Sequence, residues 1–293
     1  MEKLHQKIKA IFLDIDGTFF DHVTNQILPS SMEAIQKAKE NGYKIALCSG
    51  RPLKMAQELC VFNDIEWDGF IGSAGNTVYD EHLNLIRKNG FTNQELQTIF
   101  AIAHQKHLCL YVNGSHAFLT EDDLKAKEVL ARFHVQIPNQ IRPWKPEDSV
   151  EMISMFEGYD YDYSDFLCIP SLRLQKSSGC IVDLIKEGIN KYTGIQSMMH
   201  YWGLHENDYM AFGDSLNDKE MLQNAKLAIA MRNGDTSLFP YADFICDASY
   251  QDSIQKTPTK ISVHLRLLFS ECTFHDTINI VFKSERCKYD IIL

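Results

Sequence analysis

The amino-acid sequence predicts an α/β fold, a Rossmann-like, doubly wound and mainly parallel sheet with an inserted α+β region. The first observation is that short apolar runs alternate with helical stretches near both ends of the chain, which is typical of βα units. The second is that this alternation stops between about residues 80 and 188. The third is that 293 residues, 45 % of them hydrophobic, suffice for one large domain or two ordinary ones.

The strands of the predicted sheet are apolar runs in the outer parts of the chain, which right-handed crossovers would connect. They cover residues 10–13, 43–48, 69–72, 209–212, 227–230 and 243–246. The best-marked helix begins near Pro29, because Ser30 and Glu33 have the spacing of a capping box. The Asn-Gly pair at residues 41–42 ends this helix.

The middle of the chain predicts a separate α+β region. It contains two helical stretches, 93–107 and 121–134, and four strand-like runs, 108–112, 152–156, 172–175 and 180–184. We therefore expect residues 1–79 and 189–256 to form one domain and residues 80–188 to form the inserted domain. Residues 257–293 are a tail whose structure stays open, since its alternating runs allow added strands and a reading-frame scar is the alternative.

Two carboxylates follow the first predicted strand, in the run Asp14-Ile15-Asp16-Gly17-Thr18. On a strand, side chains two residues apart point the same way, so Asp14 and Asp16 can address one ligand. Carboxylates this close repel each other unless a cation lies between them, and a hard divalent ion such as Mg²⁺ prefers oxygen ligands. A surface loop at the end of a core strand is the alternative interpretation of this run.

A hydroxyl group follows the second predicted strand, in the run Ser49-Gly50-Arg51-Pro52. Proline is tolerated in the first turn of a helix, so a hydroxyl, backbone N–H groups and a helix N-terminus would meet here. That combination binds phosphate oxygens. Ser49 could instead be only an N-cap, and Arg51 could contact substrate or pair with a surface acid.

Further charged residues follow later in the chain. Asp214 and Asp218 come after another apolar run, where they could complete or support a metal site, although Asp214 could also be only a turn former. Lys191 precedes a helical stretch and could balance the charge of a phosphoryl group. Its neighbours Asn190 and Lys186 are alternatives for that role.

Together, these motifs resemble those of the haloacid dehalogenase superfamily, and in particular its Cof-type subgroup with a large type-IIB cap. The four motifs occur in order, as the run that begins at Asp14, then Ser49, then Lys191, then Asp214 through Asp218. The resemblance covers about residues 7 to 256. The chain departs from the usual pattern at residues 74–76 and 232–233, and neither departure removes a metal ligand or the nucleophile.

The resemblance implies a Mg²⁺-dependent phosphatase that works through an aspartyl-phosphate. Asp14 would attack phosphorus as the nucleophile. Asp16 would protonate the departing alcohol and later accept a proton from the attacking water. The metal ligands would be Asp14, Asp16 through its backbone carbonyl, and Asp214.

The remaining residues would bind and orient the phosphoryl group. Ser49 and the N–H of Gly50 would hold its oxygens, and Lys191 would neutralise developing charge. Asn217 and Asp218 would support the site, with Asp218 orienting either Lys191 or metal-bound water.

The implied substrate is a small phosphorylated metabolite, such as a sugar phosphate or a related phosphomonoester. We expect the cap to select it, with Tyr111, Asn113, His116 and Arg173 as candidate contacts. The alternatives are a phosphomutase or phosphotransferase that uses the same intermediate, and a low-turnover regulatory protein that senses a metabolite.

Composition limits the partners. The net charge of −10 argues against a nucleic-acid partner, whose phosphate backbone needs a basic face. No run of about 18 apolar residues occurs, so we expect no membrane partner. The 8 cysteines include no Cys-x-x-Cys pair, which favours reduced thiols and a cytoplasmic location. The oligomeric state stays open.

Overall fold

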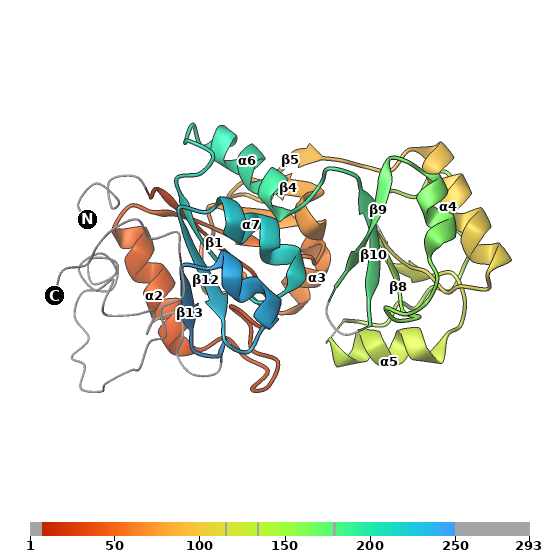
Figure 1. Cartoon of the computed structure of the whole chain (residues 1–293), viewed down its shortest axis with the longest axis horizontal. Coiled ribbons are helices and arrows are strands. Elements are labelled where there is room, and N and C mark those ends of the chain that lie inside the picture. The colour runs from red at the N-terminus through yellow and green to blue at the C-terminus, as the bar shows by residue number, and fades with distance from the viewer. Residues whose placement is uncertain (1–7, 115, 134, 178–179, 250–293) are drawn as a thin grey trace. The chain divides into compact units, whose positions relative to one another are not determined.

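A computed structural model describes residues 8–114, 116–133, 135–177 and 180–249, in two compact units (Figure 1). Among these described residues, the first unit comprises residues 8–47, 63–68 and 199–249, and the second comprises those of residues 48–62 and 69–198. The tail predicted at residues 257–293 lies outside the described residues. The division into a catalytic core and a cap at residues 79/80 and 188/189 stays a prediction.

The first unit contains a parallel sheet with the strand order β13-β12-β11-β1-β2. Its strands are β1 (Ala10–Leu13), β2 (Lys44–Cys48), β11 (Tyr209–Gly213), β12 (Leu227–Met231) and β13 (Phe244–Cys246). The register places Leu13 beside Leu47 and beside Phe212. The carboxyl ends of β1, β2 and β11 therefore meet at one edge of the sheet.

Helices connect these strands in two directions from β1. Those of this unit are α2 (Pro29–Glu40) and α7 (Lys219–Asn224) (Figure 1), with the short turns η3 (Leu216–Asp218) and η4 (Thr236–Tyr241). Helix α6 (Lys191–Tyr201) begins in the second unit and leads into β11. Helix α2 leads from β1 to β2, and α7 leads from β11 to β12 on the other side of β1. Right-handed crossovers in opposite directions place these helices on opposite faces. The predicted doubly wound α/β sheet is confirmed.

One local prediction in this unit is wrong. The N-cap of α2 is Leu28, and no side chain caps the helix, so Ser30 and Glu33 form no capping box. Pro29 occupies the first helical position, where its fixed φ and missing N–H suit the start of a helix. Ser30 therefore lies inside the first turn, two residues after the capping position.

The second unit combines an antiparallel hairpin region with a five-stranded antiparallel sheet. The hairpin region contains α3 (Leu53–Glu58), β3 (Gly69–Gly72), η1 (Ser73–Gly75), β4 (Thr77–Tyr79) and β5 (Leu85–Lys88). The sheet has the order β7-β6-β8-β10-β9, with β6 (Tyr111–Gly114), β7 (Phe118–Leu119), β8 (Val150–Met155), β9 (Leu172–Lys176) and β10 (Val182–Lys186).

Two helices cover opposite faces of this five-stranded sheet. They are α4 (Asn93–Gln105) and α5 (Leu124–Arg132), and a short turn, η2 (Ser164–Cys168), joins α4 in one of the two cores. Neighbouring residues of β6 divide between these cores, since Val112 packs with α4 and Tyr111 packs with α5. The predicted α+β region is confirmed, although β6 begins three residues later than expected and β4, β5 and β7 were not predicted.

Candidate active site

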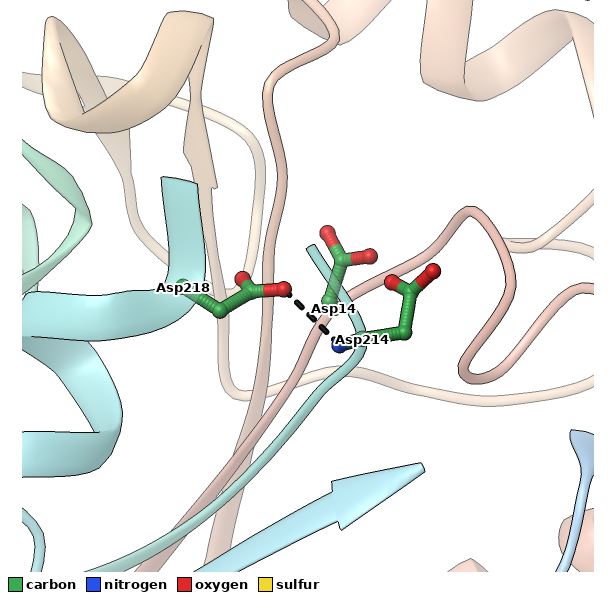
Figure 2. Close-up of side chains that lie close together, drawn as sticks. All are labelled: Asp14, Asp214 and Asp218. Carbon is green, nitrogen blue, oxygen red and sulfur yellow. Dashed lines mark hydrogen bonds between the residues drawn. The ribbon is translucent and has the colours of Figure 1, made fainter. Parts of the chain in front are cut away.

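Three carboxylates of the first unit meet at the carboxyl edge of its sheet. Figure 2 shows Asp14, Asp214 and Asp218, each of which offers a carboxylate oxygen within 4.8 Å of the other two. Asp14 follows β1 and Asp214 follows β11, and these two strands are parallel neighbours. Residues far apart in the sequence are therefore brought to one place by the strand order of the sheet.

The cluster is partly withdrawn from solvent. Asp14 is 4 % exposed and Asp218 is fully buried, while Asp214 is half-buried. Several carboxylates at such short range repel one another in a partly buried site, and a cation between them removes that repulsion. The donor set consists of carboxylate oxygens, which hard divalent ions prefer, so these residues fit a divalent metal.

Hydrogen bonds fix Asp214 and Asp218 relative to each other. Asp218 Oδ2 accepts the backbone N–H of Asp214 and that of Ser215, both at 3.0 Å (Figure 2). Thr18 Oγ1 donates to Asp214 Oδ1 at 3.3 Å, which links the first motif to the last one. The hydroxyl of Ser215 donates to Asn217 Oδ1 at 2.7 Å. The predicted supporting residues Asn217 and Asp218 thus lie in the same turn as Asp214.

Gly17 leaves the space that the Asp214 carboxylate occupies. Its φ is +81°, and a Cβ at this position would lie 2.4 Å from Asp214 Oδ2. The carbonyl oxygen of Gly17 accepts a hydrogen bond of 2.8 Å from Asn233 Nδ2. Glycine is required here both by the backbone conformation and by the close approach of Asp214.

Asp16 lies beyond the end of the strand, and its side chain has a different neighbour. Strand β1 ends at Leu13, so the alternation of strand side chains does not extend to Asp16. Its Oδ1 lies 2.7 Å from Nε2 of His22, and Asp16 is not among the three clustered carboxylates. Nothing in the sequence pattern singled out His22, since its position depends on the turn that follows Asp16.

The second unit holds Ser49, Gly50 and Lys191. Ser49 is fully buried, and its Oγ accepts the backbone N–H of Arg51 at 3.1 Å. Helix α3 begins only at Leu53 and spans 6 residues, so the predicted contribution of a helix N-terminus is small here. The contacts that remain for a phosphate at this turn are the serine hydroxyl and backbone N–H groups, such as that of Gly50.

Lys191 begins α6 and is fully buried. Its carbonyl oxygen lies 3.8 Å from Sγ of Cys48, the last residue of β2. The start of α6 is therefore next to the end of β2, where Ser49 follows. Lysine is rarely buried without a compensating partner, so the full burial of Lys191 argues against an ordinary, solvated surface lysine.

A pocket of about 240 Å³ lies in the second unit. Helix α3 supplies Lys54, Met55 and Glu58, and the five-stranded sheet supplies Tyr111 and Asn113. The other lining residues are His116, Ala117, Gln136, Ile137, Pro138, Asn139 and Gln140. The pocket thus includes three of the four candidate cap contacts, whereas Arg173 donates instead to Gln175 Oε1 and the carbonyl of Ile189.

Tyr111 and Asn113 form the buried wall of this pocket. They are 1 % and 2 % exposed, and Asn113 Nδ2 donates to the hydroxyl of Tyr111 at 3.0 Å. Burial raises the pKa of Tyr111 to about 12, so its hydroxyl stays protonated at neutral pH. The wall therefore offers neutral hydrogen-bonding groups, and α3 adds one cation and one carboxylate, Lys54 and Glu58, to the lining.

Comparison with known proteins identifies the family. The family model of the haloacid dehalogenase-like hydrolases matches residues 11–257. The chain belongs to the haloacid dehalogenase-like hydrolases. This membership confirms the predicted superfamily and the predicted class of enzyme, a phosphatase of this superfamily.

Several relatives of this haloacid dehalogenase-like hydrolase match it over most of their length. The 5-amino-6-(5-phospho-D-ribitylamino)uracil phosphatase YcsE of Bacillus subtilis (strain 168) is 25 % identical, over 85 % of this chain and 94 % of YcsE. A phosphoglycolate phosphatase of Methanobrevibacter smithii is 24 % identical, over 86 % of this chain and 98 % of the relative.

Solved structures share the fold. The phosphatase BT1666 from Bacteroides thetaiotaomicron has a TM-score of 0.76 at 21 % identity, covering 90 % of this chain and 96 % of that one. A subclass IIB sugar phosphatase, BT4131, has a TM-score of 0.76 at 24 % identity, and the match covers 87 % of this chain and 99 % of BT4131.

Two further observations concern membranes and thiols. Among the helices in the described part of the chain, none combines the length and apolar character needed to span a membrane. Within the described residues, the cysteines at positions 48, 60, 109, 168, 180 and 246 are free thiols.

Proposed function

We propose that this hydrolase is a Mg²⁺-dependent phosphatase that hydrolyses a small phosphorylated metabolite through an aspartyl-phosphate on Asp14. The observation that carries the proposal is the meeting of Asp14, Asp214 and Asp218 at the ends of parallel neighbouring strands. Such a cluster suits a divalent cation and leaves a carboxylate nucleophile beside it. When bound, Mg²⁺ would supply charge stabilisation for the phosphoryl oxygens.

The protein residues would act in two steps. In the first, an Asp14 oxygen attacks phosphorus, the bond from phosphorus to the ester oxygen breaks, and Asp16 gives a proton to the leaving alcohol. In the second, Asp16 removes a proton from water, the water oxygen attacks phosphorus, and Asp14 and inorganic phosphate are released. Ser49, Gly50 and Lys191 would hold the phosphoryl oxygens and balance their charge.

We propose that the pocket of the second unit receives the alcohol part of the substrate. Its α3 side follows the turn that carries Ser49, and its buried wall carries the hydroxyl and amide groups of Tyr111 and Asn113. A volume of about 240 Å³ suits a small polar group rather than a macromolecule. The relatives are named for activities on phosphoglycolate and on a phosphoribityl compound, which agree with a small substrate.

Replacement of the nucleophile tests this proposal. Asp14→Asn should abolish phosphate release from p-nitrophenyl phosphate, whereas Asp64→Asn, the same change at an exposed aspartate, should leave it unchanged. EDTA should remove the wild-type activity, and added Mg²⁺ should restore it. Turnover by Asp14→Asn, with an unchanged unfolding transition, would refute the assignment of the nucleophile.

A phosphate-release screen should define the substrate. Candidates are sugar phosphates, ribityl phosphates, phosphoglycolate, nucleotides, pyridoxal phosphate and flavin mononucleotide. Release of inorganic phosphate in a single turnover would separate hydrolysis from a phosphomutase reaction, in which the group returns to another hydroxyl. Absence of turnover on all candidates, with Mg²⁺ present, would favour the metabolite-sensing alternative.

A further inference from the structure

We infer that His22 is a positioning residue for Asp16, and this inference depends on the role proposed above for Asp16 as general acid and base. The ring atom Nε2 of His22 lies 2.7 Å from Asp16 Oδ1. The two side chains are 26 % and 22 % exposed, so the contact is partly shielded from water. Nothing in the motifs of the sequence assigns a role to this histidine.

The backbone around His22 is fixed by its own hydrogen bonds. Residues Asp21 and Gln26 pair with each other through N–H···O bonds of 3.0 and 3.2 Å, which close a small hairpin around His22. The carboxylate of Asp21 is 3 % exposed and accepts from the backbone N–H and hydroxyl of Thr24, at 2.7 and 2.6 Å. It also accepts from the hydroxyl of Ser249 at 2.9 Å.

The turn between Asp16 and this hairpin is closed as well. The N–H of Gly17 donates to the carbonyl of Phe20 at 2.9 Å, and the N–H of Phe20 donates to the carbonyl of Ile15 at 2.7 Å. The ring of Phe20, which is 5 % exposed, packs edge-on against the His22 ring with the centroids 5.2 Å apart. The backbone of His22 is therefore held by hydrogen bonds, and its ring is held by the ring of Phe20.

The contact has a chemical consequence for a carboxyl group that must both give and accept a proton. When Nε2–H donates to Oδ1, that oxygen keeps carbonyl character, so the proton of the neutral acid resides on Oδ2. The same N–H bond persists when Asp16 is a carboxylate, because either state of Oδ1 accepts a hydrogen bond. His22 would thus keep Oδ2 of Asp16 as the oxygen that exchanges the proton in both steps.

The test compares two substrates that differ in their need for an acid. Phenoxide is a poorer leaving group than p-nitrophenoxide, so phenyl phosphate depends more on protonation of the departing oxygen. The ratio kcat/KM covers only the steps up to transfer of the phosphoryl group, and it therefore reports the step in which Asp16 acts as an acid. The two probes have similar size, so differences in binding stay small.

His22→Phe removes the N–H donor but retains an aromatic ring against Phe20. We expect kcat/KM for phenyl phosphate to fall about 10-fold more than that for p-nitrophenyl phosphate, which is a part of the 10²–10⁴-fold that general acid catalysis contributes in total. His22→Gln, whose amide N–H can take the place of Nε2–H, should restore most of the loss. His205→Phe, the same change at an exposed histidine, should have no effect.

A second background distinguishes this inference from the proposed function. In the Asp16→Ala variant, adding His22→Phe should lower kcat/KM no further, because the carboxyl group that His22 positions is already absent. Equal losses for the two substrates, failure of His22→Gln to recover activity, or additive losses in the double variant would overturn the role of His22. If the wild type itself released no phosphate, or if Asp16→Ala retained full activity, the proposed function would fail instead.

Discussion

Replacement of Gly17 by alanine tests the geometry of the acid cluster directly. A Cβ at residue 17 would lie 2.4 Å from Oδ2 of Asp214 and 3.0 Å from its Cγ, whereas ordinary contacts begin near 3.4 Å. The carboxylate would have to move by about 1 Å. That movement would also disturb the hydrogen bond of 3.3 Å from Thr18 Oγ1 to Asp214 Oδ1.

Gly42 provides a matched control for the backbone contribution. It has a φ of +83°, close to the +81° of Gly17, but nothing lies within 4 Å of the Cβ it would gain. Alanine at a positive φ costs about 1–2 kcal/mol. Both substitutions should therefore lower the free energy of unfolding by a similar amount, and only Gly17→Ala should disturb Asp214. A displacement of about 1 Å in a reacting site can cost about 10²-fold in rate.

The assay is phosphate release from p-nitrophenyl phosphate as a function of Mg²⁺ concentration, with urea unfolding measured in parallel. We expect Gly17→Ala to need at least about 10-fold more Mg²⁺ for half-maximal activity, and to lose at least about 10-fold in kcat/KM. Gly42→Ala should match the wild type in its Mg²⁺ dependence and in kcat/KM, although it too loses unfolding free energy. A Gly17→Ala enzyme with unchanged Mg²⁺ dependence, or equal losses of kcat/KM in the two variants, would refute the close approach of residue 17 to the metal ligand.

Three further predictions concern charged residues. Asp218→Asn should weaken Mg²⁺ binding about 10-fold in a metal titration, while Asp235→Asn, at an exposed capping aspartate, should not. Burial raises the pKa of Asp183 to about 6, so its carboxyl group must ionise in a buried place as the pH rises from 4 to 6. In urea titrations the free energy of unfolding of the wild type should fall by up to about 3 kcal/mol over this rise, and that of Asp183→Asn should not show this fall. Burial alone would raise the pKa of Glu95, but its hydrogen bonds lower it to about 2, so Glu95→Gln should lose about 1–2 kcal/mol, a difference that shrinks as pH falls below 4.5.

The outline of the sheet could be predicted because each buried parallel strand is a short apolar run. The run at residues 209–212 illustrates this, since β11 is buried along its whole length and extends the prediction by one residue. Strands β4 and β5 were not predicted because they are 3 and 4 residues long and lack a distinctive pattern. The residues of β5 are exposed or half-buried, so no apolar run marks it.

The site residues that directly follow a strand could be predicted from the sequence, because an apolar run marks where the strand ends. Asp14 and Asp214 follow β1 and β11, and the order of strands brings them together. Their roles as nucleophile and metal ligand stay predictions. The contact of Asp16 with His22 could not be predicted, because it arises from a turn and a small hairpin whose closure depends on backbone hydrogen bonds and on Ser249, far along the chain.

The acid cluster also couples the stability of the fold to its ligand. At 4.8 Å and an effective dielectric constant of about 20, each of the three carboxylate pairs repels by about 3 kcal/mol, and the folded chain must offset the total of about 10 kcal/mol. The two N–H bonds to Asp218 offset part of it, each contributing roughly 1.5–3 kcal/mol as bonds to a charged group. A bound divalent ion would offset the rest and add about 2.7 kcal/mol at a concentration 100 times its Kd. A site arranged in this way is least stable when empty, and the destabilisation follows directly from gathering the negative charges that the proposed reaction needs.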